Sequence, residues 1–463
     1  MAAAHRRAAL LNGLPGGGRP LGTALAALLL AAGAAAQAPQ GQAQGELTLA
    51  EVLREIASRS TVAVSAGLDL DAARESTRRT QASYYPSVDL SVGHFNRDNP
   101  VVAIVGAFAA PTSEKNFFTG ELDVSELLWD GGRRSGAVRV ARSTEDAVGM
   151  QGQADVRAAQ LEGMETYLAI LASKAQLHVV AQREASLRDH LREVKDLFEQ
   201  GVVARNDLLA TEVRLRSVQD QAGRVDNDAA AATQALNRLM GRDPVEQLAL
   251  PAQLPSPPLL AAGTDDLGKR AAAGNKRLLA LQARLRTEQD MVAVRKADSY
   301  PTFIAQASHT YQQNQYLLYP NANYLFLGVN WQAYDGGARR AGVREAELAV
   351  ARTTQQIADL QRQLGIQVSR AYNDYQQALR EAATAETNVK ASEENLRIVE
   401  DQYKSGLARS TDVLDAESTL AESRFTLVNQ HYNAYLKQGV LLNVTGEDLP
   451  AFYSSLVPKR QER

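Results

Sequence analysis

One stretch of this chain is written twice. The segment FEQGVVARNDLLATE begins at Phe198, and YKSGLARSTDVLDAE begins at Tyr403, 205 residues later. In each copy a glycine-led turn follows a helical run, and an aspartate precedes a new heptad run, which is typical of a helix–turn–helix tip. The two copies share four identities: Gly201/Gly406, Asp207/Asp412, Leu209/Leu414 and Glu212/Glu417.

The repetition extends well beyond the tips. Three more motifs recur: Asp130-Gly131-Gly132 with Asp335-Gly336-Gly337, Leu236…Gly241 with Leu441…Gly446, and Tyr85-Pro86 with Tyr300-Pro301. The Tyr-Pro pairs lie 215 residues apart, so the first copy has ten extra residues before its Asp-Gly-Gly motif. We therefore expect one structural unit, duplicated, and a function that suits this symmetry.

The first 36 residues have the pattern of a secretory signal peptide. Arg6, Arg7 and Arg19 supply positive charge, residues 21–36 form an apolar run, and three alanines precede Gln37 at a predicted cleavage site. We exclude residues 1–36 from the fold. No later stretch approaches ~18 consecutive apolar residues, so we expect no transmembrane helix.

Composition excludes several classes of site. The chain has no cysteine, which excludes disulfides, thiolate metal sites, a catalytic cysteine and an acylated N-terminal cysteine. The net charge of −3 gives no argument for nucleic-acid binding. The six histidines have no metal-ligand spacing, so we expect neither metal nor cofactor.

The first repeat is predicted over residues 37–243. A helix begins at Thr48 with a capping box and continues to about residue 83. Alternating apolar and polar residues then predict strands at about 86–97 and 117–129, with a loop between them. A helical hairpin follows over 133–240 with its tip near 201. Its first helix has no proline and would be about 98 Å long.

The second repeat follows a linker over 244–263 that contains five prolines. It spans 264–449, with a helix over 264–298, strands at about 302–311 and 324–334, and a helical hairpin over 337–445 with its tip near 406. The tail, 450–463, is expected to be loose. The fold class is mainly α with a small β part.

Four strands per chain cannot close a barrel, because closed membrane barrels need at least about eight. Chains must therefore pool their strands. The predicted lumen charges are Asp89, Glu121 and Asp123, while the alternate residues suit lipid. A signal peptide, half-apolar strands and very long helices together predict an oligomeric β-barrel in an outer membrane, continued by a tube of helices.

The doubled layout, the Tyr-Pro and Asp-Gly-Gly motifs and the tip sequence YKSGLARSTDVLDAE resemble the TolC-like outer-membrane export channel family over roughly residues 47–449. The resemblance implies a homotrimer with a twelve-stranded barrel in outer-membrane lipid and a twelve-helix periplasmic tunnel. It also implies no catalysis. Its partners would be a periplasmic adaptor (membrane fusion) protein and an inner-membrane ABC or proton-driven transporter.

The resemblance also assigns roles at the tips. Gly201-Val202 and Gly406-Leu407 match the turns that meet the adaptor. Asp412 and Asp415 match the residues that ring the closed pore. Tyr403 and Asp207 match a latch that holds the pore shut. The family's latch arginine falls on Ala408 here, and Arg409 follows it. One residue turns a helical side chain by about 100°, so Arg409 departs from the pattern.

Structural roles compete with these assignments. Asp207, Asp412 and Asp415 lie near helix starts, where a carboxylate caps the helix. Tyr403 is equally compatible with simple packing, and the three strand carboxylates with ordinary exposed polar positions. The segment from Gly263 to Arg270 is close to a P-loop but lacks its final Ser/Thr and the preceding strand.

Three functions of different classes follow. The first is a passive exit duct, the second a periplasmic coiled-coil scaffold, and the third a hydrolase or ATPase, which lacks a complete site. Within the first, the absence of an acylated cysteine favours type I secretion of a large, toxin-like protein over efflux of drugs or other small molecules, by analogy.

Overall fold

The computed structural model describes residues 46–257, 259–260 and 263–456, within the compact unit Glu46–Arg463. The predicted signal peptide and residues 457–463 lie outside the described residues. The predicted fold class is confirmed: nine α-helices and six strands are described, and most residues are helical.

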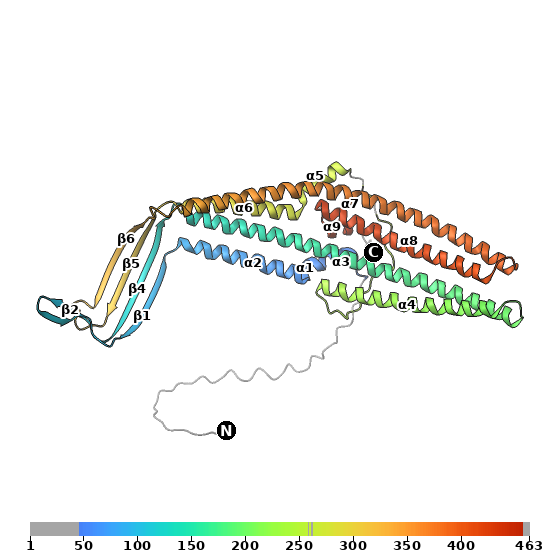
Figure 1. Ribbon diagram of the computed structural model, residues 1–463, viewed down its shortest axis with the longest axis horizontal. Coiled ribbons are helices and arrows are strands. Elements are labelled where there is room, and N and C mark those ends of the chain that lie inside the picture. The colour runs from blue at the N-terminus through green and yellow to red at the C-terminus, as the bar shows by residue number, and fades with distance from the viewer. Residues whose placement is uncertain (1–45, 258, 261–262, 457–463) are drawn as a thin grey trace, which may run out of the picture. The chain divides into compact units, whose positions relative to one another are not determined.

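Four strands form one antiparallel sheet (Figure 1). They are β1 (Ser87–Asn96), β4 (Asn116–Trp129), β5 (Thr302–Gln312) and β6 (Asn321–Asn330), in the order β1-β4-β5-β6. Apolar residues on one face remain exposed; Val92 and Leu325 are 75% and 71% accessible. Within the described chain the outer edges of β1 and β6 are also unpaired.

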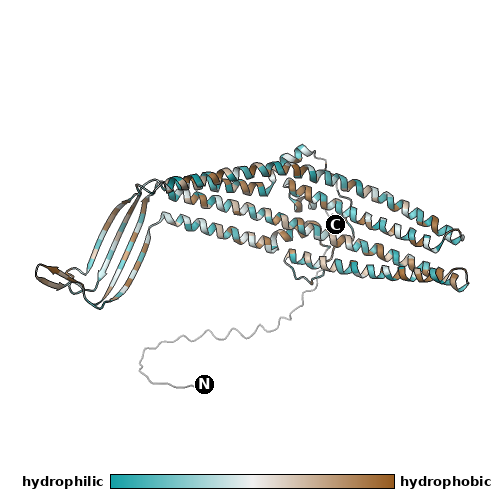
Figure 2. Ribbon diagram, in the orientation of Figure 1, coloured by the Kyte–Doolittle hydropathy of each residue, from teal (hydrophilic) through white to brown (hydrophobic). Residues whose placement is uncertain are grey.

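The strands differ from the prediction in two places. The predicted loop between the first two strands contains a small hairpin, β2 (Val102–Val105) with β3 (Phe108–Pro111). Its residues are apolar, as Figure 2 shows. The strand predicted over 324–334 instead ends at Asn330, because its partner β5 begins at Thr302, opposite Asn330.

Two helices run without interruption, and the others are shorter. The long pair are α3 (Arg133–Glu199) and α7 (Ala338–Lys404). The others are α1 (Leu49–Arg59), α2 (Thr61–Gln81), the 3-10 turn η1 (Ala82–Tyr84), α4 (Arg205–Met240), α5 (Thr264–Gly274), α6 (Lys276–Ala297), α8 (Ser410–Thr445) and α9 (Leu449–Leu456). No helix among the described residues is both long and apolar enough to cross a membrane.

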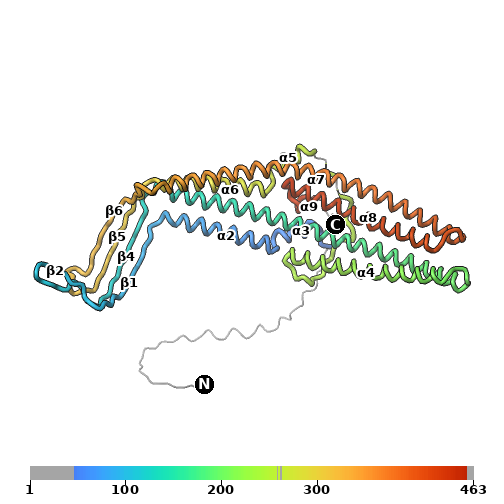
Figure 3. Tube along the Cα trace, in the orientation of Figure 1, coloured from blue at the N-terminus to red at the C-terminus, as the bar shows by residue number. Residues whose placement is uncertain are grey.

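The helices lie side by side in four rows (Figure 3). Next to the strands the neighbours are α2, α3, α6 and α7 in that order; towards the tips they are α4, α3, α8 and α7. Two rows are therefore the continuous helices α3 and α7. The other two are composite, α1/α2 with α4 and α5/α6 with α8.

The composite rows meet end to end. A Cβ built on Gly241, which ends α4, would lie 2.6 Å from the Arg59 carbonyl oxygen at the end of α1. One on Gly446, which ends α8, would lie 2.5 Å from the Gly274 backbone at the end of α5. Both glycines have positive φ, 73° and 80°. Only glycine fits there, because it combines a left-handed backbone with the absence of a side chain.

Each helix predicted before a first strand is broken. Ser60 separates α1 from α2 and caps α2 with its hydroxyl, which accepts from Ala63 N–H. Asn275 separates α5 from α6 and caps α6 with its amide oxygen, which accepts from Leu278 N–H. Their side chains compete with the helical backbone for hydrogen bonds, which sequence periodicity does not register.

The expectation of a loose tail is wrong for residues 450–456, which belong to α9 (Leu449–Leu456). Tyr453 is buried there, and its hydroxyl donates to Gln438 Oε1 at 3.3 Å. The apolar residues Leu449 and Tyr453 join the main core, which also contains α1 and the middle of α3.

Candidate gate and docking surface at the helical tips

Two symmetric corners join the sheet to the long helices. Asp130 accepts the N–H groups of Gly132 and Arg134 at 3.1 and 2.7 Å. Asp335 accepts those of Gly337 and Arg339 at 3.0 and 2.8 Å. The hydrogen bond from the Arg339 side chain and these N–H groups lower the pKa of Asp335 to about 2. The corners fix the start of α3 and α7, the two helices that run on to the tips.

Both tips turn at a glycine and expose an apolar side chain. Gly201 and Gly406 have φ of 74° and 73°. The next residues close the turn: Val202 N–H donates to Leu197 O at 2.9 Å, and Leu407 N–H to Gln402 O at 2.8 Å. Val202 and Leu407 are 66% and 82% accessible. The tips thus present two equivalent apolar projections, as expected of a docking surface.

Asp412 and Asp415 lie on the one exposed row of α8. From the tip this row continues through Thr419, Glu422 and Thr426. The remaining surface of the helix packs mainly on α7 and α3, with smaller contacts to α5, α4 and α9. Asp412 also accepts the Arg409 N–H at 2.8 Å, so it is a helix cap as well. Asp415 makes no side-chain hydrogen bond or ion pair within the described chain, and its carboxylate is free for another partner.

Tyr403 is part of a buried contact between α3, α7 and α8. Its ring meets the ring of His190 edge to face at 5.3 Å, and His190 Nε2 lies 3.0 Å from Ser410 Oγ. The Tyr403 hydroxyl is buried without a hydrogen bond in the described structure. Burial raises the pKa of Tyr403, with smaller contributions from Glu193 and Asp207. No hydrogen bond joins Tyr403 to Asp207 in the described structure.

Arg409 does not join this contact. Its side chain is exposed at the start of α8 and forms no ion pair within the described chain. The three predicted latch residues are thus brought to one end of the helices, but the described chain alone completes no latch.

A buried ion pair near the tip has no signature in the sequence. Arg183 Nε on α3 lies 3.3 Å from Glu417 Oε2 on α8, and their side chains are only 11% and 7% accessible. Arg183 also donates to Ser418 Oγ at 3.3 Å. Burial raises the pKa of Glu417, and Arg183 opposes this. Glu417 was visible as a residue shared by both tips, but its partner lies 234 residues away.

The three predicted strand carboxylates share one face of the sheet. Asp89 and Asp123 are directly opposite each other on β1 and β4, and Glu121 lies two residues along from Asp123. Asp123 accepts a hydrogen bond from Gln306 at 3.0 Å. Their face is opposite the one that carries Val92, because side chains alternate along a strand.

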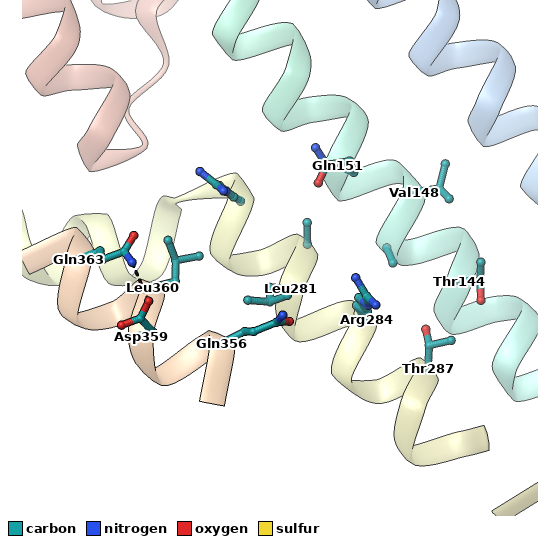
Figure 4. A pocket seen from close by; sticks show the side chains of 13 residues that line it. Thr144, Val148, Gln151, Leu281, Arg284, Thr287, Gln356, Asp359, Leu360 and Gln363 are labelled. Atoms are coloured by element: carbon teal, nitrogen blue, oxygen red, sulfur yellow. Dashed lines mark hydrogen bonds between the residues drawn. The ribbon is translucent and has the colours of Figure 1, made fainter. Parts of the chain in front are cut away.

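A cavity between α3, α6 and α7 gives no sign of chemistry (Figure 4). Its polar lining, including Gln151, Arg284, Gln356 and Asp359, comes from separate helices, and Asp359 accepts a hydrogen bond from its helical neighbour Gln363 at 2.6 Å. The described residues contain no group of three or more His, Asp or Glu that could hold a metal ion. The tips are therefore the candidate functional site.

This chain is similar to known outer membrane proteins over most of its length. A family model described as outer membrane efflux protein matches residues 52–242 and 267–447. Outer membrane protein TolC of Vibrio cholerae serotype O1 is 22% identical over 401 residues, covering 84% of this chain and 88% of that protein.

Two solved structures have the same fold. The outer membrane protein VceC of Vibrio cholerae is 17% identical with a TM-score of 0.72, over 86% of this chain and 96% of that one. The CmeC outer membrane channel of Campylobacter jejuni is 13% identical with a TM-score of 0.74, over 88% of each chain.

Proposed function

Because the chain belongs to the outer membrane efflux protein family, we propose that it is the exit duct of a tripartite export system. The family is one of channels and not of enzymes, and the protein is an outer-membrane channel that extends into the periplasm. Three features of this duct are proposed below: its oligomeric state, the position of its gate and its cargo.

The assembly proposed is a homotrimer. The exposed apolar face and the two open edges of the sheet favour it, because a membrane barrel has no free edge. Three chains of four strands would supply a twelve-stranded barrel, and four helical rows per chain a twelve-helix tunnel.

Aromatic residues mark where the sheet would leave the membrane. Trp129, Tyr300 and Trp331 gather where the strands meet the helices, each about half exposed. Trp129 and Tyr300 are in edge contact at 6.1 Å. Such aromatic girdles are typical of the membrane–water interface. The ten residues of β1 span about 33 Å, enough for the hydrocarbon layer with some tilt.

The gate proposed is at the tip of α8. The observation that carries it is the single exposed row of α8, on which Asp412 and Asp415 come first. Repeated in three copies, they would form two rings of negative charge that attract cations. A latch with a neighbouring copy would be completed by Tyr403, Asp207 and Arg409.

The adaptor would dock on the two turns, Gly201-Val202 and Gly406-Leu407. The adaptor would in turn be joined to an inner-membrane ABC or proton-driven pump.

For the cargo, type I secretion of a large, toxin-like protein is proposed. The chain has no cysteine, so its N-terminus cannot carry an acylated cysteine, and by analogy this favours protein secretion. Small-molecule efflux is the second candidate, and the description of the family as efflux proteins favours it. Deleting the gene separates the two: loss of a secreted protein supports the first, and drug sensitivity with normal secretion overturns it.

Single-channel conductance in planar bilayers tests the duct and its gate. Purified wild-type protein should give small cation-selective steps that divalent cations block. Asp412→Ala/Asp415→Ala should lose that block, whereas Glu212→Ala, on the first-repeat helix, should keep it. Protein that stays soluble without detergent and never conducts would contradict the channel, and a block unchanged in the double variant would contradict this gate.

A further inference from the structure

An open cavity lies where α2 and α3 meet the sheet (Figure 1). Its volume is about 690 Å³. Three of the residues that line it are arginines, Arg78, Arg139 and Arg142, and two are tyrosines, Tyr84 and Tyr85. None of the described residues in its lining is acidic. We call this cavity the arginine pocket, and its charge suits an anionic ligand.

The arginines of α3 lie on the side of that helix which α9 covers further along. A Cβ on Gly439 of α8 would contact Met164 of α3 and lie 3.7 Å from the hydroxyl oxygen of Tyr453 on α9. Arg142 and Arg139 precede Met164 by 22 and 25 residues, which is about six and seven helical turns. The three side chains therefore share one side of α3.

That side is the outer surface of the helical rows. Gln438 and Gly439 are buried beside Tyr453 of α9, whereas the exposed row of α8 that begins with Asp412 and Asp415 runs along the other side of the helix. The proposed gate requires this exposed row to face the pore. The arginine pocket then faces outwards, so the inference below rests on the proposed channel.

The arginine pocket lies at the depth of the lipid headgroups. The aromatic residues around Trp129 mark the end of the membrane-spanning strands. Arg139 is six residues into α3, and Arg78 is six residues before Tyr84, so each lies about 9 Å from the end of its helix that adjoins the strands. The headgroup layer is about 5–8 Å thick. An arginine side chain is long enough to reach back into it.

Exposed apolar side chains continue from the pocket into the membrane. The strand β1 begins two residues after Tyr85, and its apolar face exposes Val88, Leu90 and Val92, which are 63%, 72% and 75% accessible. A ligand in this place meets cations at one end and an apolar strand at the other. A phospholipid has this combination of phosphate and acyl chain, whereas a free anion uses only the arginines.

We propose that the arginine pocket binds the phosphate of a phospholipid in the periplasmic leaflet of the outer membrane, with an acyl chain along the apolar face of β1. A guanidinium group suits this ligand because it binds two phosphate oxygens through parallel N–H groups. Tyr84 and Tyr85 are 47% and 75% accessible and would lie at the membrane–water interface, where tyrosine is enriched.

The arginines retain hydrogen-bond donors for this ligand. Arg142 is exposed and forms no hydrogen bond or ion pair within the described chain. Arg139 Nε lies 3.2 Å from Asp290 Oδ1, and Arg78 Nη1 lies 2.5 Å from Glu75 Oε1. Ion pairs at the surface contribute little to stability, and each guanidinium has five N–H groups, so both arginines can also bind a phosphate.

The duplication provides an internal comparison for the pocket. Adding 205 to the bounds of α3 (133–199) gives those of α7 (338–404). Adding 215 to the first residue of α2 (61) gives that of α6 (276). The second repeat therefore has the same backbone elements at the equivalent place, and its side chains show which features of the pocket the fold itself requires.

The second repeat does not keep the charge of the pocket. Arg78 corresponds to Ala293. Arg142 corresponds to the carboxylate Glu347, whose Oε2 lies 3.4 Å from Nη1 of Arg344, the equivalent of the remaining arginine. The fold thus forms with one arginine and a neutralising carboxylate at this place. Three arginines without an acidic residue in the lining are a property of the first repeat alone, as expected of a binding site.

Native mass spectrometry of the purified full-length protein with added dioleoyl phosphatidylglycerol tests this site. Wild-type protein should retain a tightly bound lipid on each chain. Arg139→Ala/Arg142→Ala should weaken the binding about 25-fold, because each arginine near an anionic lipid contributes roughly a fivefold factor. Arg139→Lys/Arg142→Lys keeps the charges but loses the paired hydrogen bonds, so it should weaken the binding less.

The matched control is Arg340→Ala/Arg344→Ala, which removes two exposed arginines at the equivalent level of α7. It should bind the lipid as wild type does. Equal weakening by the two alanine double variants would indicate only a general attraction to basic helices and would overturn the pocket. Inorganic phosphate in large excess should not displace the lipid, and displacement would overturn the acyl-chain contact with β1.

Conductance in planar bilayers separates this site from the proposed channel. An Arg139→Ala/Arg142→Ala protein that conducts is folded, so unchanged lipid binding by that protein would overturn the pocket and leave the channel standing. Wild-type protein that never conducts and stays soluble without detergent would overturn the channel, and the lipid site with it.

Discussion

Replacing Arg183 with alanine should loosen the tip of α8 at neutral pH. The variant leaves the Glu417 carboxylate, 7% accessible, without its cation. Breaking a buried pair in this way costs about 3–5 kcal/mol. We expect a loss near the lower limit, about 3 kcal/mol, because the carboxyl group can take up a proton instead of remaining charged.

The loss should depend on pH in a definite direction. Burial already raises the pKa of Glu417, and Arg183 opposes it, so the variant raises it further. A carboxyl group whose folded-state pKa is raised stabilises the fold fully below its unfolded-state pKa and loses that contribution as pH rises through the folded-state value. The Arg183→Ala tip should therefore regain stability as pH falls towards about 5.

Amide hydrogen exchange of residues 410–424 measures this local stability directly. Protection should fall in Arg183→Ala at neutral pH and recover in Arg183→Met/Glu417→Gln, which has no buried charge. Arg188→Ala, which removes an exposed arginine one to two turns away, is the control. Unchanged protection in Arg183→Ala, or a loss independent of pH, would contradict a stabilising role for the Arg183–Glu417 pair.

Two further predictions concern backbone and charge. Gly446→Ala should lower the thermal unfolding temperature far more than Gly406→Ala. Both glycines have positive φ, which costs an alanine about 1–2 kcal/mol, but only Gly446 also contacts the Gly274 backbone. Equal effects would contradict the end-to-end contact of α8 with α5. Burial lowers the pKa of His190, so its contribution to tip stability is present above the usual value of 6.5 and is lost as pH falls below it. His190→Gln should therefore lose less exchange protection than wild type between neutral pH and about pH 5.5, and parallel pH profiles would contradict this.

The sequence predicted the architecture well because the duplication supplies each signal twice. Tip glycines, Asp-Gly-Gly corners and alternating strands recur in register; the structure has the tips and corners where the sequence predicts them, and the last strand ends earlier, at Asn330. The helix breaks at Ser60 and Asn275 were missed because hydrophobic periodicity continues across them. The helix α9 was missed because its stability comes from burial of Tyr453 in a core formed by distant segments.

The site was predictable only where it is local in sequence. Turn glycines and helix-start aspartates have short-range signatures, and Asp412 is both exposed and a cap. The Arg183–Glu417 pair and the His190–Tyr403 contact depend on which faces of α3, α7 and α8 meet. That choice is made by side-chain packing between helices, which no spacing rule within one helix encodes.

The end-to-end contacts of α4 with α1 and of α8 with α5 have a mechanical consequence. At that level, among the helices that the structure describes, only α3 and α7 continue unbroken. The other two rows transmit force through Gly241 against Arg59 and through Gly446 against Gly274. Such contacts resist compression but not tension. The four helical rows should therefore bend where these helix ends meet more readily than elsewhere along their length. Tension applied to the tips would then be absorbed by this bending before it reaches the strands.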